Sequence, residues 1–357
     1  MRSLGGPASW RGHELVEDQR WLRVWPDRCI DAFDHALAHA ARAGLEWWQA
    51  DRSRFPLSAV AEDIAELAHF LEHDRGVLKL TGLPLDRYSP MQQKTLFYGI
   101  GSWLGRPVYQ TAAGELLGEI CDEGADVGAR RGQMVDADGK AFKSSRARAQ
   151  SDGPLRWHTD RTDVVGLLCA GCPARGGTSK IASAIAVHDE MVARRPELAE
   201  LLYQDLERSN LGEETGGADR TYAIPVWDVR NGHFATHYSR TFVEAAQKLP
   251  HVRTLSDQHW EALDLLAQLA QEHCLEMEFA PGDMQFINNH VVYHARDAFE
   301  DDIAAGQRRL LYRVWLSMEN SRPLPASFSV LFGDTDAGAM RGGIRQPSGQ
   351  SFPQQVV

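Results

Sequence analysis

Residues 157–163 read WHTDRTD and place groups that bind metals or carry protons just before an apolar run, VVGLLC. His158 and Asp160 lie two positions apart. On an extended strand, the side chains of residues i and i+2 project from the same face, so both can reach one point. With one more histidine from elsewhere, they would complete the two-histidine, one-carboxylate ligand set of non-haem Fe(II) enzymes. The motif alone is not specific, because a short polar turn before a strand also produces it.

A second stretch, residues 285–299 with the sequence QFINNHVVYHARDAF, can supply the missing donor. It contains two histidines, His290 and His294, and each is a candidate third ligand. The alternating apolar residues around them predict strands, which would carry a histidine toward the same point as His158 and Asp160.

The strand expected at 308–318 carries Arg309 and Arg313, in addition to Arg308 at its start. By the two-residue alternation of a strand, Arg309 and Arg313 share one face with Leu311 and Trp315. Two guanidinium groups on the inner face of a sheet are costly unless an anion meets them. A dicarboxylate would do so, because guanidinium pairs with carboxylate through two parallel hydrogen bonds. The alternative is an edge strand whose arginines are solvated.

Composition restricts the class of protein. The chain has 357 residues, 43% of them hydrophobic, which is enough for one elaborated domain with a large core. A net charge of −11 argues against a nucleic-acid partner. The five scattered cysteines do not form a disulfide framework, and no run of about 18 apolar residues could span a membrane. We therefore expect a cytoplasmic protein with no membrane partner, and we leave a homo-oligomer open.

Hydrophobic periodicity and turn residues predict the elements that must position these side chains. Helices are expected at 32–50, 56–73, 89–105, 186–208 (with a break near Pro196) and 257–274, and strands at 76–84, at 308–318 and, as a pair around a Pro-Gly-Asp turn, within 276–295.

The segment 130–156 differs from the rest of this acidic chain. Its seven Lys and Arg residues against three Asp residues give a local charge of +4. It is either a solvated surface loop or a mobile lid that carries positive charge over an anionic ligand. We expect a single domain over 1–335, with an N-terminal helical and strand part at 10–107 and this lid-like insert at about 130–156. A loop-like tail follows at 336–357.

In combination, these motifs resemble the Fe(II)/2-oxoglutarate-dependent dioxygenases of the taurine dioxygenase and clavaminate-synthase-like family. The resemblance extends from about Trp10 to Leu324 and keeps one order along the chain. It includes GVLKLTGLP, GSWLGRPV, WHTD, GGTS, PGDMQFINN, YHARDAF and RRLLYRVWL. It implies an α+β, mainly β fold with a double-stranded β-helix (jelly-roll) core and flanking α-helices.

The resemblance also implies roles for individual residues. His158, Asp160 and His294 would bind the iron, with His294 favoured over His290 by its spacing to the arginines. Arg309 would hold the distal carboxylate of 2-oxoglutarate, and Arg313 would lie near the carboxylate close to the iron. The family often has Gly-Gly-x-Thr where this chain has Gly-Gly-Thr-Ser, so Ser179 is the expected hydroxyl contact, with Thr178 as the alternative.

The implied activity is that of an Fe(II)-, 2-oxoglutarate- and O2-dependent dioxygenase. It would hydroxylate a C–H bond of a small organic acid, amino acid derivative or natural-product intermediate, releasing succinate and CO2. Two other readings stay open: a non-catalytic jelly-roll protein that binds a metal or a small acid, and a zinc hydrolase with the same three ligands. Candidate substrate contacts are polar residues near the ends of expected elements: Gln110, Thr111, Asn288 and Asn289.

Overall fold

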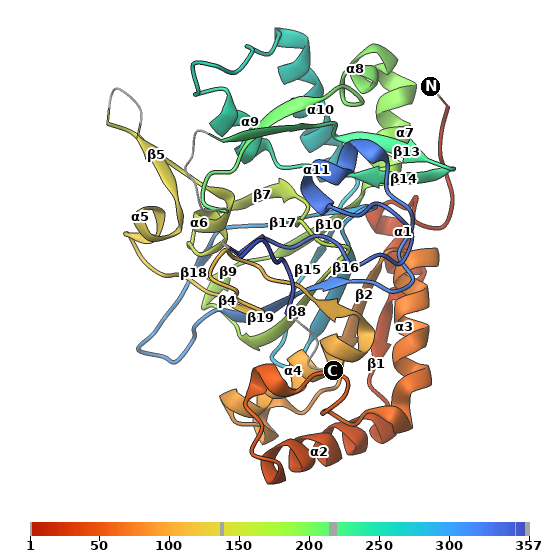
Figure 1. Cartoon of the computed structure of the whole chain (residues 1–357), viewed down its shortest axis with the longest axis vertical. Coiled ribbons are helices and arrows are strands. Elements are labelled where there is room, and N and C mark those ends of the chain that lie inside the picture. The colour runs from red at the N-terminus through yellow and green to blue at the C-terminus, as the bar shows by residue number, and fades with distance from the viewer. Residues whose placement is uncertain (1, 136–138, 214–219, 347, 354–357) are drawn as a thin grey trace.

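The computed structural model describes residues 2–135, 139–213, 220–346 and 348–353. Within these residues it contains a seven-stranded sheet, a four-stranded sheet and several two-stranded ribbons, with helices on the outside (Figure 1). The helices are α1 (Gly12–Glu17), α2 (Asp27–Arg42), α3 (Ala61–His73), α4 (Pro90–Leu104), α5 (Val127–Arg131), α6 (Ser145–Ala149), α7 (Ala184–Arg194), α8 (Pro196–Leu201), α9 (Arg240–Ala246), α10 (Asp257–Glu272) and α11 (Ser329–Phe332).

The strands of the large sheet run in the order β1-β2-β16-β8-β19-β3, and β4 also pairs with β19. Their bounds are β1 (Leu22–Val24), β2 (Val77–Thr81), β16 (Met284–Asn288), β8 (Val164–Gly171), β19 (Leu310–Ser317), β3 (Arg106–Pro107) and β4 (Leu117–Ile120). The smaller sheet has the order β15-β10-β17-β7. Its strands are β15 (Leu275–Met277), β10 (Ser179–Ser183), β17 (Val292–Arg296) and β7 (Leu155–His158).

The paired ribbons lie outside these two sheets. They are β5 (Gln133–Val135) with β6 (Ala141–Lys143), β9 (Arg175–Gly176) with β18 (Phe299–Glu300), β11 (Leu206–Ser209) with β12 (Thr221–Ile224), and β13 (Trp227–Arg230) with β14 (His233–Thr236).

Helices cover one face of each sheet. The large sheet packs against α3 and α4, with α2 outside α4, while α7 and α10 pack against the smaller sheet. In Figure 1 the first group lies at the lower right and the second at the top, with the strands between them. The α4 start is as predicted: Ser89 accepts a hydrogen bond from the Gln92 amide, and Pro90 occupies the first helical position.

The faces turned away from the helices carry the polar side chains. Leu311, Arg313 and Trp315 of β19 alternate with Tyr312 and Val314, as the sequence pattern predicts. Tyr312 and Val314 face α4, whose Gly101 lies against the Val314 side chain. Arg313 and Trp315 therefore lie on the other face of the sheet, where they contact the residues described below.

Gly166, in the middle of β8, lets the core side chains approach this strand closely. A Cβ atom at this position would lie 2.7 Å from the Phe286 ring and 3.0 Å from a Val314 methyl group. Gly166→Ala is therefore expected to destabilise the fold by about 1–3 kcal/mol, the usual cost of overpacking a core. Urea unfolding would measure it. Gly101→Ala is the matched control, because its Cβ would meet the same methyl group at an ordinary 3.5 Å.

Several elements differ from the sequence prediction. The helix expected at 32–50 ends at Arg42, because Gly44 adopts a left-handed conformation (φ 62°) that closes the helix. The segment 276–295 holds parts of three strands rather than two, since Asn289 and His290 form a second turn between β16 and β17. Residues 206–208, expected to be helical, belong to β11, because the helical segment ends with α8 at Leu201.

The basic segment 130–156 contains the β5–β6 ribbon and α6, and its residues 136–138, with Asp136 and Asp138, lie outside the described part. The ribbon projects from the body of the molecule (Figure 1). Much of its charge is paired: Arg131 with Glu123, Arg146 with Glu115 and Arg156 with Glu244.

The C-terminal tail carries no helix or strand among its described residues after Phe332, but it packs against the fold. Arg341 and Ile344 are buried, and the Ile344 amide donates to the Tyr109 carbonyl. Residue 347 and residues 354–357 of the tail lie outside the described part. No helix in the described part of the chain is long and apolar enough to cross a membrane.

Candidate metal centre and its surroundings

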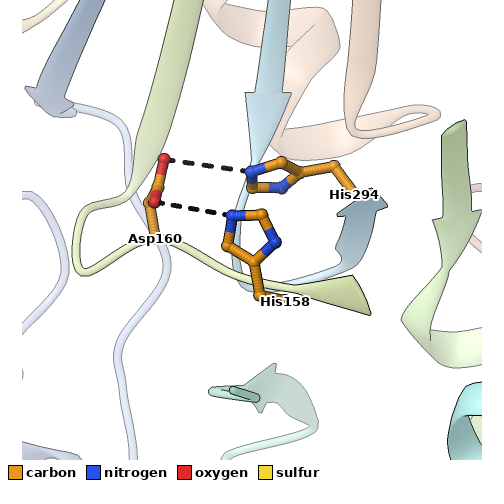
Figure 2. A group of neighbouring side chains, drawn as sticks. All are labelled: His158, Asp160 and His294. Carbon is orange, nitrogen blue, oxygen red and sulfur yellow. Dashed lines mark ion pairs between the residues drawn. The ribbon is translucent and has the colours of Figure 1, made fainter. Parts of the chain in front are cut away.

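His158, Asp160 and His294 meet at one point (Figure 2). His158 ends β7 and lies directly opposite His294 of β17 in the sheet register, with ring centroids 4.1 Å apart. Asp160 follows in the turn that leads into β8. Its two carboxylate oxygens lie 4.0 Å from His158 Nε2 and 3.9 Å from His294 Nε2. The expected third histidine, 134 positions after Asp160, is therefore His294.

The imidazole nitrogens of His158 and His294 are in a state that can bind a cation. His158 Nδ1 hydrogen-bonds the Arg156 carbonyl at 2.8 Å, so Nε2 is the nitrogen left to face Asp160. Burial lowers the pKa of His158, and burial with the neighbouring His158 lowers the pKa of His294 to about 3. Both imidazoles are then neutral and can donate lone pairs. Two imidazoles and one carboxylate on adjacent strands suit a divalent transition metal with open positions.

Asp160 is held by groups from two segments, the turn between β16 and β17 and the strand β19. Its amide donates to the Asn289 side-chain oxygen at 2.9 Å, and the Trp315 indole donates to its Oδ2 at 3.0 Å. Arg313 Nη1 lies 3.7 Å from its Oδ1. Burial opposes ionisation of this carboxyl, but the charge of Arg313 and the hydrogen bond from Trp315 favour it, and the pKa of Asp160 lies below its ordinary value. The carboxylate is therefore charged and fixed in orientation.

Arg313 is in turn held by Gln110. Arg313 Nε donates to Gln110 Oε1 at 2.7 Å, and Gln110 Nε2 donates to the Arg313 carbonyl at 2.8 Å. The guanidinium also lies over the Trp315 ring, 5.0 Å from its centroid. Gln110 was expected to contact the substrate. Its side-chain amide instead bonds Arg313 and holds this arginine beside Asp160.

Arg309 directly precedes β19 and lines a cavity of about 260 Å³. The cavity is also lined by Leu311, Cys169, Gly177 and Thr178. The Arg309 side chain is buried, its Nη1 has no hydrogen-bond partner, and burial lowers its pKa to about 10. The Phe299 ring, 5.2 Å away, is the aromatic neighbour of this guanidinium. A buried cation without a carboxylate partner fits an anionic ligand.

The two hydroxyl candidates face different ways. Ser179 pairs with Arg296 in the register of β10 and β17, two residues from the Ile181–His294 pair, so it shares the face of His294. Thr178 precedes the strand and donates its hydroxyl to Glu278 at 2.5 Å. Thr178 lines the cavity that Arg309 also lines, whereas Ser179 lies on the strand face that carries His294.

The remaining candidates are engaged elsewhere. Asn288 donates to the Leu71 carbonyl and to Glu72 on α3, and Thr111 Oγ1 accepts the Glu115 amide. His290, the alternative third ligand, hydrogen-bonds Asp163 at 2.8 Å instead of joining the cluster.

One arrangement near the site was not predicted from the sequence. Arg296 is buried and donates to the carbonyls of Ser151 and Gly153, which ties the end of the basic segment to β17. Its sequence signal was only an arginine two residues after His294, on the same strand face. Cys169 and Cys172, with sulfur atoms 3.7 Å apart, are free thiols, and Cys169 is buried as expected for a structural thiol.

Residues 40–315 match the family model described as taurine catabolism dioxygenase TauD, TfdA family. FR-33289 synthase of Streptomyces rubellomurinus is 26% identical over 92% of this chain and 94% of its own length. The taurine hydroxylase-like protein SAT17 of Stachybotrys chartarum is 25% identical over 91% and 83%, respectively.

Solved structures show the same fold at lower identity. Asparagine oxygenase, in complex with Fe(II), 3-hydroxyasparagine and succinate, has a TM-score of 0.64 at 15% identity and covers 90% of this chain and 100% of its own. The non-heme iron oxygenase OrfP, in complex with Fe, succinate and (3S)-hydroxy-L-Arg, has a TM-score of 0.60 at 15% identity, over 89% and 99%.

Proposed function

The chain belongs to the TauD/TfdA dioxygenase family, and on that premise we propose that it hydroxylates a C–H bond of a small organic acid, amino acid derivative or natural-product intermediate. As a member of this family it is a dioxygenase that uses Fe(II), 2-oxoglutarate and O2. The reaction would release succinate and CO2.

We infer that the two main sheets form the double-stranded β-helix core of this family. Three features support the inference: the antiparallel pairing of β16, β8 and β19, the antiparallel pairing of β10, β17 and β7, and the helices on the outer faces. The metal ligands come from β7, from β17 and from the turn before β8, which connects one sheet to the other. Such a core holds its polar residues between the sheets, away from bulk water.

The observation that carries the proposal is the convergence of His158, Asp160 and His294. These residues would hold Fe(II) on one face and leave the opposite positions open. When bound, the iron with 2-oxoglutarate supplies the oxidising chemistry, for which no protein nucleophile is needed. The protein's part is to keep the three donors fixed, which it does through the Arg156 carbonyl, Asn289 and Trp315.

The co-substrate would lie between the metal centre and Arg309. Arg309 offers a buried guanidinium with an unpartnered nitrogen for the distal carboxylate, and Ser179 offers a hydroxyl on the metal-facing side. Arg313 would lie near the carboxylate close to the iron, beside Asp160. The acidic segment 300–306, between β17 and Arg309, helps to fix the position of Arg309. Asp302 and Gln307 pair to close this segment into a loop, and the Asp301 side chain accepts the Arg309 amide.

Ser179→Ala is expected to raise the 2-oxoglutarate concentration for half-maximal rate about 10-fold, because a hydrogen bond to a charged group contributes roughly 1.5–3 kcal/mol. Thr178→Val removes the other hydroxyl, whose partner is Glu278, and should change this concentration little. Steady-state rates of succinate formation would compare the two variants. A larger effect at position 178 would transfer the role to Thr178.

The proposed substrate class rests on the ligands bound in two solved relatives. Asparagine oxygenase and OrfP are solved with hydroxylated amino acids, which favours an amino acid derivative as the substrate of this chain.

We propose that Gln110 and Asn289 position Arg313 and Asp160 and do not bind the substrate, since their side-chain amides already bond these two residues. Thr111 and Asn288 would act within the scaffold for the same reason.

The test is an anaerobic titration of the Fe(II)-loaded protein with 2-oxoglutarate. Chelation of the iron by the keto acid gives a weak visible charge-transfer band. The proposal expects this band in the wild type and its loss in His158→Ala. A screen of amino acids and organic acids for stimulated 2-oxoglutarate consumption would then identify the substrate class. Absence of the band in iron-loaded wild-type protein would overturn the assignment.

A further inference from the structure

Asp163 is a second buried carboxylate, three residues after the metal ligand Asp160. Its side chain is 2% exposed and makes three contacts. Oδ1 lies 2.7 Å from Arg341 Nε and 2.8 Å from His290 Nε2, and Oδ2 accepts the Met318 amide at 2.9 Å. Asp163 is thus paired through both oxygens, although it takes no part in the chemistry proposed above.

The cation that neutralises Asp163 comes from the C-terminal tail. Arg341 is completely buried, and each of its nitrogens has an acceptor. Besides Asp163, the guanidinium donates to the carbonyls of Arg322 and Asp336, at 2.8 and 3.1 Å. The backbone amide of Arg341 donates to Ser317 Oγ at the end of β19. A buried, fully bonded arginine fixes the position of whatever it binds.

Asp163 is linked to the metal carboxylate through Asn289. The Asp163 carbonyl accepts the Asn289 amide at 2.9 Å, and the Asn289 side-chain oxygen accepts the Asp160 amide at 2.9 Å. The turn that carries Asn289 is also held by His290, through its bond to the Asp163 carboxylate. The placement of Asp160 therefore depends on the turn between β16 and β17, and that turn depends on Asp163.

The charges of this network balance without the metal. Arg341 is paired with Asp163, and on the neighbouring turn Arg322 is paired with Glu72 at 2.7 Å. Burial lowers the pKa of His290 to about 4, so its imidazole is neutral at pH 7. If Arg341 is lost, Asp163 keeps its buried charge and must rearrange its contacts with His290 and Met318, because an unpaired buried charge is costly.

We propose that Arg341 is a positioning residue of the metal centre, acting through Asp163 and Asn289 on the metal ligand Asp160. The inference rests on the proposed function, because it takes His158, Asp160 and His294 to be the metal ligands. It assigns the tail after Phe332 to the active-site scaffold. Loss of an outer-shell partner of a metal ligand typically lowers metal affinity 10–100-fold.

The test compares Arg341→Lys with Arg345→Lys, using Mn(II) as a redox-inert probe. Lysine keeps the charge at position 341 but cannot make the bonds to Asp163, Arg322 and Asp336 together. Arg345 is exposed and lies four residues further along the same tail. We expect the Mn(II) dissociation constant, from the electron paramagnetic resonance signal of free Mn(II), to rise about 10-fold in Arg341→Lys. It should stay at the wild-type value in Arg345→Lys.

A purely structural role would lower the unfolding temperature and leave the affinity of the folded protein unchanged. The double variant Arg341→Lys with Asn289→Ala separates the two cases. If the effect passes through Asn289, the double variant binds Mn(II) no more weakly than Asn289→Ala alone. If the two effects on affinity multiply, the proposed route through Asn289 is wrong.

Ser317→Ala provides a gentler variant if Arg341→Lys does not fold. It removes the hydroxyl that accepts the Arg341 amide and donates to the Ala339 carbonyl, and it leaves the Arg341 side chain in place. A rise of about threefold in the Mn(II) dissociation constant is expected, within the range of one hydrogen bond. An unchanged constant in the folded variants overturns this inference. A wild-type protein that does not bind Mn(II) would instead count against the proposed function itself.

Discussion

Replacing His294 by alanine is expected to abolish metal binding and O2-dependent succinate formation together. The variant keeps two of three donors, and the loss of a direct ligand should weaken Mn(II) or Fe(II) binding by more than about 100-fold, beyond what an outer-shell change causes. Equilibrium dialysis with Mn(II) and the anaerobic 2-oxoglutarate titration would measure the two effects separately.

The folded state of this variant should survive. His294 Nδ1 is buried without a hydrogen-bond partner, so alanine at this position breaks no hydrogen bond of that nitrogen. The main loss is the contact with the His158 ring. His39→Ala is the control, because His39 is exposed on α2 and lies outside the cluster. Normal metal binding by the His294 variant would contradict the ligand set, and so would its loss in the His39 variant.

The proximity of His158 to Asp160 and the orientation of Arg313 could be predicted from the sequence because both depend on short spacings. Alternation along β19 places Arg313 on the face of Trp315, and Asp160, two residues after the end of β7, stays close to His158. The Ser-Pro start of α4 is equally local and was confirmed. The choice between His290 and His294 required the pairing of β17 with β7, and the resemblance to a family supplied it.

The supports of the site could not be predicted in this way. Gln110 reaches Arg313 across 203 positions, Asn289 reaches Asp160 across 129, and Arg341 reaches Asp163 across 178. A glutamine or asparagine near the end of an element has the same sequence signal whether it binds substrate, a backbone amide or another side chain. Arg341 lies in a glycine-rich tail whose composition indicates a loop, and only tertiary contact shows that it is buried.

The site contains buried charged side chains that do not stabilise the ligand-free fold. Arg313 lies beside Asp160, a carboxylate that the metal would share, and Arg309 is buried with an unpartnered nitrogen. Groups held in advance for a ligand reduce the stability of the ligand-free protein, because their desolvation is not fully compensated. Substitution at Arg309 should therefore separate stability from binding.

Arg309→Met is expected to weaken 2-oxoglutarate binding about 100-fold, since losing one partner of a buried charge pair costs roughly 2–5 kcal/mol. The same change should leave the ligand-free protein as stable as the wild type or more stable, because it replaces a buried guanidinium by an apolar chain of similar length. Thermal unfolding in Mn(II), with and without 2-oxoglutarate, measures both effects. The wild type should gain stability with the ligand, and the variant should gain far less at the same concentration.

Arg308→Met is the matched control, one residue earlier and exposed. It removes the same charge from the same segment, so it tests whether the general positive field, rather than a direct contact, attracts the diacid. We expect its ligand-induced stabilisation to equal that of the wild type. If Arg309→Met also retained the full stabilisation, the distal carboxylate would have to bind elsewhere, and Arg309 would have no role in co-substrate binding. If Arg309→Met unfolded at a much lower temperature without ligand, the guanidinium would be part of the scaffold, supported by its contact with Phe299.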